Sequence, residues 1–195
     1  DPRNELYFRM IRAARVLKPK AIIIENVSTV IHSKEQVVQQ SVKFLEEMGY
    51  HVVQETLWAN HFGVPQKRKR HFLLASKVSM PDLSMLDMYR MDENRTLRWA
   101  IEDLLGEYDT SDIYNQPARS NEENQSRMNW LIDNNEWDLP NELRPKCHQN
   151  GHNYPAVYGR MKWDEPSSTI TSGFRSNGQG RFTHPSAKPG RPLTP

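Results

Sequence analysis

An apolar run that stops at a carboxylate constrains the fold of this sequence more than any other feature. Ala21 to Ile24 is short and rich in β-branched side chains, as is typical of a strand buried on both faces of a sheet. Glu25 follows directly, so we expect the strand to end there. Ligands of open α/β sheets bind beyond the carboxyl ends of the strands. Glu25 is therefore the first candidate for a functional site, and the alternative is a loop charge that points to water.

Helices and further strands are predicted on either side of this run. Apolar residues recur at helical spacing before Pro19, and Ser33 with Gln36 forms a capping box, while Gly49 is expected to end the helix that follows. The predicted elements are helices over residues 4–17 and 33–48, and strands over residues 51–59 and 70–75. This strand–helix–strand order predicts an α/β fold with a mostly parallel sheet covered by helices.

The sequence becomes irregular from about Lys77 onward, which predicts a second domain. Only short helices are expected there, over residues 97–105 and 121–132. The last part, from Tyr154 to Pro195, is dense in Gly, Ser, Thr and Pro, so we expect turns and short strands around residues 168–171. The four tryptophans of this half are expected in its core, namely Trp99, Trp130, Trp137 and Trp163.

Charge is distributed unevenly along the chain. Residues 1–80 carry 13 basic and 7 acidic residues, residues 81–150 carry 7 and 15, and residues 151–195 carry 6 and 2. This asymmetry suits a protein that presents two basic surfaces to a polyanion. The sequence has no apolar run of the ~18 residues that a membrane span needs and no secretory signal, and its single cysteine excludes an internal disulfide. We expect a cytoplasmic protein whose two ends are both truncated, since Asp1 stands where an initiator methionine would.

Five residues, Gln66 to Arg70, form a second candidate feature. Strand alternation would place Gln66, Arg68 and Arg70 on one face and the two lysines on the other. Arginine offers planar, bidentate donors that suit a phosphate or a base carbonyl, whereas lysine acts as a point charge. The alternative is a solvated basic patch, but the preceding Phe62-Gly63-Val64-Pro65 predicts a defined turn.

Four ordered motifs resemble those of DNA (cytosine-5) methyltransferases. They are Ile24-Glu25-Asn26-Val27, then Phe62 to Arg70, then Tyr158-Gly159-Arg160-Met161 with Asp164-Glu165-Pro166, Thr169-Ile170-Thr171, Gly178 to Phe182 and His184-Pro185, and finally Arg191-Pro192-Leu193-Thr194-Pro195. The resemblance covers nearly the whole chain except about residues 80–150. It implies the C-terminal half of a Rossmann-like methyltransferase sheet that depends on S-adenosylmethionine, followed by an irregular target-recognition domain.

The resemblance also implies roles for single residues. Glu25 would bind the N3 and amine edge of a cytosine flipped out of the duplex, Arg70 would contact O2 of the base, and Arg68 would support the pocket or a phosphate. A cysteine attacks C6 in this chemistry, and the proton at N3 and the cation at O2 stabilise the charge that enters the ring. Extrusion of the base is required because C5 and C6 are not accessible inside the stack. Because the glycine-rich cofactor loop and the Pro-Cys-Gln motif are absent, we expect the nucleophile and S-adenosylmethionine site outside this chain, which alone would be inactive.

Contacts to DNA are expected from the basic, glycine-rich segment near the end of the chain. Hydroxyls and amides there can hold phosphate oxygens, and glycines allow close approach of the backbone. The candidate DNA-binding residues are Gln66, Thr169, Thr171, Arg175, Ser176, Gln179 and Arg181. By the same resemblance, residues 1–79 belong to the catalytic domain, 80–190 to the target-recognition domain, and 191–195 to a truncated return to the catalytic domain.

Other functions and sites compete with this interpretation. Cys147 with His148 and His152 could be three metal ligands, but there is no CxxC pair, so we expect no metal. Cys147 also lacks the strand-end context of a nucleophile. The competing functions are a cytosine-5 tRNA methyltransferase and a non-catalytic nucleic-acid-binding subunit of a split enzyme. The expected partners are double-stranded DNA and a cognate restriction endonuclease, in a monomeric bacterial or phage protein with no membrane association.

Overall fold

The computed structural model describes residues 5–106, 111–149 and 156–194 of the chain. They divide into two compact units. Unit 1 comprises Asp1–Gly63 and Arg68–Asp92, and unit 2 comprises Val64–Lys67 and Glu93–Pro195. The assignment of residues 1–79, 80–190 and 191–195 to functional domains remains a prediction. None of the described helices is long and apolar enough to cross a bilayer.

Unit 1 contains a three-stranded sheet made of β1 (Ala21–Val27), β2 (His51–Trp58) and β4 (Lys69–Ser76), in the order β1-β4-β2. The predicted mostly parallel sheet is wrong for these strands, because β4 is antiparallel to both of its neighbours. The short 3-10 turn η3 (Ala59–Phe62) is part of the connection that reverses the chain after β2. β1 and β2 do run in the same direction, but β4 lies between them.

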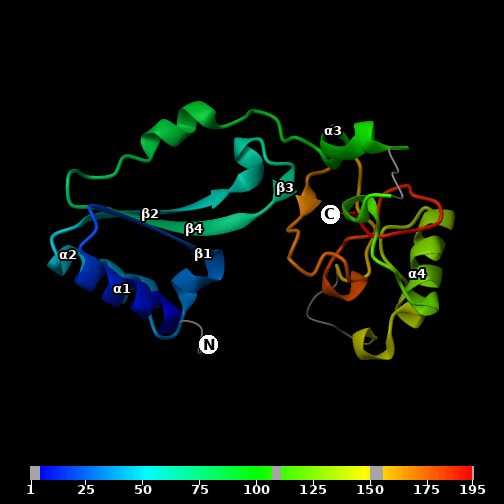
Figure 1. The fold of residues 1–195 in the computed structure, drawn as a ribbon, viewed down its shortest axis with the longest axis horizontal. Helices are drawn as coiled ribbons and strands as arrows, with labels where there is room; N and C mark the ends of the chain where they lie inside the picture. The colour runs from blue at the N-terminus through cyan, green and yellow to red at the C-terminus, as the bar shows by residue number, and fades with distance from the viewer. Residues whose placement is uncertain (1–4, 107–110, 150–155, 195) are drawn as a thin grey trace. The chain divides into compact units, whose positions relative to one another are not determined.

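Helices α1 (Glu5–Leu17) and α2 (Val37–Glu47) pack on one face of this sheet (Figure 1). The core between them consists of apolar side chains from both layers, including Ile11, Ala14, Val38, Leu45, Ile24, Leu73 and Ala75. The helix predicted from Ser33 begins only at Val37, because Gln36 adopts a left-handed conformation with φ of 47°. The predicted capping box is therefore wrong, although Ser33 Oγ accepts a hydrogen bond from the amide of Val37 at 3.2 Å. Gly49 ends the helix region with φ of 83°, as predicted.

The opposite face of the sheet presents a different set of side chains. His71, Leu73 and Ala75 are buried on the helix side, so Arg70 and Phe72, which alternate with them, face the other way. Figure 1 shows the 3-10 segment η4 (Ser84–Tyr89) on that side, away from α1 and α2. A further 3-10 turn, η2 (Ser28–His32), follows β1 directly.

Unit 2 contains little regular structure. Its longer helix is α4 (Glu122–Asp133), which Asn121 caps by accepting a hydrogen bond from the amide of Asn124 at 2.9 Å. The helix predicted over residues 97–105 consists of α3 (Leu97–Ile101) and the 3-10 turn η5 (Glu102–Leu104). The remaining elements are short: β3 (Gln66–Lys67), η6 (Ile113–Asn115), η7 (Asn141–Leu143), η8 (Lys146–His148), β5 (Ser167–Ser168) and η9 (Asn177–Gln179).

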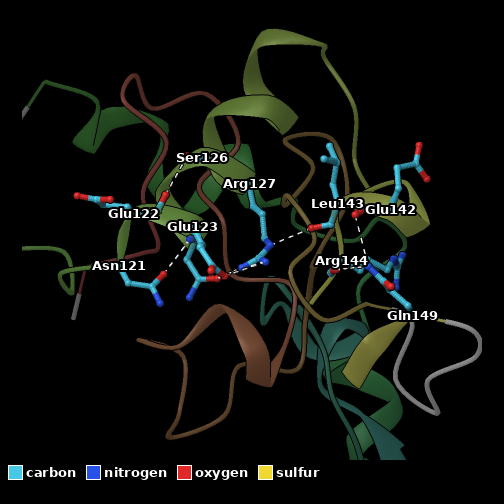
Figure 2. A network of polar contacts seen from close by, with 10 residues as sticks. Asn121, Glu122, Glu123, Ser126, Arg127, Glu142, Leu143, Arg144 and Gln149 are labelled. Atoms are coloured by element: carbon cyan, nitrogen blue, oxygen red, sulfur yellow. Dashed lines mark hydrogen bonds and ion pairs between the residues drawn. The ribbon is translucent and has the colours of Figure 1, made fainter. Parts of the chain in front are cut away.

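Hydrogen bonds to loop carbonyls hold α4 in place. Figure 2 shows Arg127 between Leu143 and Glu123; it donates to the carbonyl of Leu143 at 2.9 Å and to Glu123 Oε2 at 3.2 Å. Arg127 also donates to Asn124 Oδ1 at 2.8 Å. The core of unit 2 includes Met128, Leu131, Met161 and Phe182. Trp130, Trp137 and Trp163 are half-buried, but Trp99 is 59% exposed and stacks on Arg95, so its predicted place in the core is wrong. In the short helix α3 the buried side chain is that of Leu97 rather than Trp99.

Candidate active site and DNA-contact segment

Glu25 lies within β1 rather than at its end. The strand continues through Asn26 to Val27, because the backbone there pairs with β4, with Glu25 opposite Phe72 and Val27 opposite Arg70. The expectation that the strand ends at Glu25 is therefore wrong. In an antiparallel pair, residues directly opposite one another project to the same face. Glu25 and Arg70 consequently share the sheet face that α1 and α2 leave uncovered.

Two arginines converge on a single oxygen of Glu25. Arg70 Nε lies 3.1 Å from Glu25 Oε1, and Arg68 Nη2 lies 3.2 Å from the same atom. Arg70 Nη1 also donates to the carbonyl of Lys69 at 2.7 Å. Among the described residues no side chain pairs with Glu25 Oε2, so this oxygen is available to a ligand.

Exposure differs among the three charged side chains of this cluster. The Glu25 side chain is 43% exposed and that of Arg68 is 37% exposed, whereas that of Arg70 is only 18% exposed. Exposed ion pairs contribute at most about 1 kcal/mol to stability, because water and salt screen them. The ion pairs among these three side chains therefore add little to the stability of the fold, which does not explain why the three charges lie together. The structure thus brings together all three predicted catalytic residues, with spare donors and a spare acceptor.

The turn formed by η3 and Gly63 positions Arg68 and Arg70 beside Glu25. Gly63 adopts φ of 81°, which side chains with a Cβ rarely reach, and it closes η3 by donating to the carbonyl of Asn60. The amide of Ala59, at the start of η3, donates to the carbonyl of Arg68 at 2.8 Å. Lys69 points away from Glu25 and lies over the ring of Trp58, 5.2 Å from its centre. For Arg68, Lys69 and Arg70 this agrees with the predicted alternation. The prediction is wrong for Gln66 and Lys67, because they form the separate strand β3, which pairs with β5.

In unit 2, Gln66 and Lys67 form a short parallel ladder with Ser167 and Ser168. Thr169 Oγ1 donates to the carbonyl of Lys67 at 2.9 Å and so extends this contact. Lys67 Nζ lies 2.7 Å from Glu165 and Lys162 Nζ lies 3.0 Å from it. The hydrogen bond from Lys67 and then that from Lys162 lower the pKa of Glu165 to about 2. A cavity of about 240 Å³ lies beside this cluster.

Most of the predicted DNA-contact residues are exposed in unit 2. Thr171, Arg175, Ser176 and Gln179 are exposed around the 3-10 turn η9. Arg175 forms no ion pair with any described residue, so its charge is free to meet a phosphate. Thr169 is half-buried, and its hydroxyl donates within the unit.

Arg181 is the predicted DNA-contact residue whose donors are used internally. Its Nη1 donates to the carbonyls of Trp137 at 2.7 Å and of Arg160 at 3.0 Å, and its Nη2 lies 2.6 Å from Asp138 Oδ1. Gly159 packs against this guanidinium, and a Cβ there would lie 2.8 Å from its carbon. The geometry favours a role for Arg181 in holding unit 2 together.

Sequence reasoning assigned no role to two other arginines, although Arg160 belongs to one of the motifs. Arg160 is buried, and its guanidinium donates to the carbonyls of Pro185 at 2.6 Å and of Leu131 at 3.2 Å and to Asn135 Oδ1 at 3.1 Å. Burial lowers its pKa. Arg90 belongs to no recognisable motif and pairs with two carboxylates in unit 1. A buried arginine gives no sequence signal, since the same letter normally predicts an exposed side chain.

Cys147 lies in η8 and is exposed. Within residues 5–106, 111–149 and 156–194, no group of three His, Cys, Asp or Glu side chains could hold a metal ion. His152, one of the three ligands considered for a metal, lies outside those residues. A groove of about 650 Å³ between α1 and α2 lies on the sheet face opposite Glu25.

Comparison with known proteins decides the family. The family model described as C-5 cytosine-specific DNA methylase matches residues 1–195. The chain belongs to this family. Membership of this family confirms the resemblance that the motifs indicated.

Two relatives of this chain are described as type II enzymes. The chain is 40% identical over 196 residues to the type II methyltransferase M1.BsuMI of Bacillus subtilis, covering 100% of this chain and 45% of that protein. It is 32% identical over 190 residues to the type II methylase M.HgiDII of Herpetosiphon aurantiacus, covering 93% of this chain and 53% of that protein. The methylase chain therefore spans about half the length of the curated relatives it matches.

Solved structures share the fold of this methylase chain. The S. pombe Dnmt2 methyltransferase superposes with a TM-score of 0.53 at 18% identity, covering 94% of this chain and 50% of that chain. The Entamoeba histolytica methyltransferase EhMeth gives 0.52 at 17% identity, covering 96% and 49%. This likeness supports the predicted α/β fold class.

Proposed function

We propose that this chain is the part of a DNA (cytosine-5) methyltransferase that holds the flipped target cytosine and contacts the duplex around it. The reaction would transfer a methyl group from S-adenosylmethionine to C5 of that cytosine, in a restriction-modification context. One observation carries the proposal: Arg68 and Arg70 both bind one oxygen of Glu25 and leave the other oxygen free, on the sheet face away from α1 and α2, in a chain that belongs to this family.

The three side chains divide the work on the base. Glu25 holds the N3 and exocyclic amine edge of the cytosine, with Oε2 as the atom that remains available. Arg70 places a cation at O2, where negative charge accumulates when a nucleophile adds to C6. Arg68 shares the same carboxylate oxygen and fixes the orientation of Glu25. The less exposed Arg70 is the better placed to act on the base, because low exposure to water strengthens its interaction with the developing charge.

The duplex would be contacted by the exposed residues of unit 2. Thr171, Arg175, Ser176 and Gln179 offer hydroxyl, guanidinium and amide groups that can reach phosphates or base edges. Gln66 and Thr169 support the contact segment through the β3–β5 ladder. We assign Arg181 to the support of this segment as well, since three internal acceptors occupy its guanidinium.

The cofactor would be held mainly by residues outside this chain. β1 is followed by Ser28-Thr29-Val30-Ile31 rather than by a glycine-rich loop, so this segment does not offer a glycine-rich cradle for S-adenosylmethionine. When bound, that cofactor supplies the methyl group. We propose that the nucleophilic cysteine is also outside the chain and that the chain alone is inactive. The enzyme would act as a monomer on double-stranded DNA in a bacterial or phage-infected cytoplasm, alongside a cognate restriction endonuclease.

The test is methyl transfer by the complete gene product that carries this chain. Glu25→Gln should lower the single-turnover rate about 10²-fold or more, the usual scale for a positioned acid, while duplex affinity changes less than about twofold. Glu46→Gln is the matched control, because Glu46 is exposed on α2 and should leave the rate unchanged. Bisulfite sequencing of host DNA reports the activity and its target motif together. A Glu25→Gln variant that keeps half of the wild-type rate would contradict the proposed site.

A further inference from the structure

Arg90 follows η4, and its guanidinium contacts three separate parts of unit 1. Its Nε lies 2.7 Å from Asp87 Oδ1, and its Nη2 lies 3.2 Å from Glu55 Oε1 on β2. The guanidinium carbon is 5.2 Å from the centre of the Phe62 ring in η3. Asp87, and then Glu55, raise the pKa of Arg90. Arg90 therefore joins η4, β2 and η3 as a permanent cation.

Glu55 belongs to the same sheet face as the candidate active site. Within β4, Phe72 lies opposite Glu25 on one side and opposite Glu55 on the other. One row along the sheet, Arg70 lies between Val27 and Leu57. Residues in register across a sheet project to the same face. Arg90 is thus anchored at the β2 edge of the face where Arg70 meets Glu25.

The backbone beside Arg90 is tied to the turn that positions the arginines. The amide of Met91 donates to the carbonyl of His61 at 2.8 Å. The amide of Ala59, at the other end of η3, donates to the carbonyl of Arg68 at 2.8 Å. The four-residue turn is therefore held at one end by Arg68 and at the other by the Arg90–Met91 segment.

We infer that Arg90 is a positioning residue that fixes η3 and, through it, the placement of Arg68 and Arg70 against Glu25. The inference rests on the proposed function and deepens it. Without the Glu55 and Asp87 contacts, the Arg90 side chain would no longer be fixed over the Phe62 ring. The hydrogen bond from the amide of Met91 to the carbonyl of His61 would then weaken. The Arg68 backbone would then be free to shift, and displacements on the order of 1 Å can cost up to about 10²-fold in rate.

Arg98 provides a matched comparison in unit 2. It also binds two carboxylates, with Nη1 2.6 Å from Glu102 and Nε 2.9 Å from Asp164, and its guanidinium lies 5.5 Å from the ring centre of Trp163. Its side chain is 41% exposed against 37% for Arg90. The two arginines thus have the same kind of environment, but only Arg90 is connected to the turn before Arg68.

The experiment compares Arg90→Ala with Arg98→Ala in the complete gene product, with melting temperature, the KM for duplex DNA and the single-turnover rate measured for each. Both variants should melt at similarly reduced temperatures. Arg90→Ala should lower the rate about tenfold with the KM for DNA within about twofold of wild type, whereas Arg98→Ala should keep the rate. Arg90→Lys, which can pair with one carboxylate but lacks the planar fork, should restore part of the loss, to about threefold below wild type.

An unchanged rate in Arg90→Ala, or an equal loss in Arg98→Ala, would overturn the inference. Should Arg90→Ala fail to fold, Glu55→Gln provides the same test, because it weakens one Arg90 contact and leaves Asp87 in place. A rate about threefold below wild type supports the inference, and an unchanged rate overturns it. The two proposals fail separately: a normal Arg90→Ala rate beside inactive Glu25→Gln refutes only the inference, whereas a normal Glu25→Gln rate refutes the proposed function.

Discussion

Two pairs of arginines in this chain have opposite uses. Arg68 and Arg70 in unit 1 share one oxygen of an exposed carboxylate. Arg160 and Arg181 in unit 2 donate chiefly to backbone carbonyls, which belong to segments far apart in the sequence. The side chains of Arg70 and Arg181 are equally exposed, at 18% each, so burial does not distinguish them.

The partners of these arginines distinguish them instead. A guanidinium that donates to several carbonyls has few donors left for a ligand, and removing it costs each of those carbonyls one hydrogen bond. A guanidinium that shares one carboxylate oxygen with a second arginine retains free N–H donors. The other carboxylate oxygen lies beside it as an acceptor that a substrate can use. The number of internal acceptors around an arginine therefore predicts whether its loss affects folding or chemistry.

The largest effect is expected at Arg160. Arg160→Met should lower the free energy of unfolding of the chain by about 4 kcal/mol, because three acceptors each lose one hydrogen bond when a buried guanidinium is removed. Urea unfolding measures the change, and Arg175→Met, at an exposed position, is the control. A loss below about 1 kcal/mol would show that the carbonyls find other donors. It would contradict the conclusion that Arg160 and Arg181 serve the fold while Arg68 and Arg70 serve the site.

Arg70 and Arg181 provide the direct contrast. In the complete gene product, Arg70→Ala should lower the single-turnover rate about 10²-fold with little change in melting temperature. Arg181→Ala should lower the melting temperature and leave the rate at saturating DNA within about threefold. The dependence of DNA affinity on salt adds a second measurement for Arg181. A slope reduced by about one unit would show that its guanidinium reaches a phosphate, as the sequence first suggested.

A pH effect of about 2 kcal/mol is expected from His184. Its Nδ1 accepts hydrogen bonds from the amides of Ser186 at 3.1 Å and Ala187 at 3.0 Å, which requires the neutral ring. Burial, and then the charge of Arg191, lower the pKa of His184 to about 4. His184 binds a proton more readily in the unfolded state than in the folded state. The stabilisation that neutral His184 provides is therefore complete above about pH 6.5 and is lost as the pH falls toward 4.

Unfolding of the chain at pH 7.5 and pH 5 tests this prediction. His184→Asn keeps an acceptor near the position of Nδ1 but does not titrate, so its stability should fall less between the two pH values. Burial also lowers the pKa of His71, which is present in both proteins and contributes equally to each. Identical pH dependence in the two proteins would exclude His184 as the source.

The smallest effect is expected at Cys147. Cys147→Ser in the complete gene product should keep wild-type turnover and still form a covalent complex with DNA that contains 5-fluorocytosine. The thiol is exposed in η8, a three-residue turn that offers no helix N-terminus to activate it. Loss of the covalent band on a denaturing gel would place the nucleophile inside this chain.

Local patterns in the sequence predicted several elements correctly. The β-branched run at Ala21 to Ile24 forms a strand, Val38 and Leu45 are buried, and Gly49 ends the helix region. Asn121 caps α4, and this helix begins at Glu122, one residue after its predicted start. These features depend on neighbours within a few residues. The grouping of Glu25 with Arg68 and Arg70 came from the family resemblance, and the side-chain distances agree with it.

Other features depend on partners that are distant in the sequence. The insertion of β4 between β1 and β2 decides the antiparallel pairing, and no local pattern reports it. The extension of β1 beyond Glu25 likewise depends on His71 and Arg70 of β4. The internal use of Arg181 requires the carbonyls of residues 137 and 160, so sequence alone favoured exposure. The left-handed Gln36 moved the start of α2, although its sequence matches a capping box.

The outer edge of β1 has a consequence for handling the chain in solution. β1 pairs with β4 on one side, and no described strand lies on its other side. Ile23 is 69% exposed and Val27 is 48% exposed on this strand. An unpaired strand edge with apolar side chains is a template for the same edge of another molecule. Expressed by itself, the chain is therefore prone to edge-to-edge aggregation that begins at residues 21–27, and a lysine in place of Ile23 is the change that would oppose it.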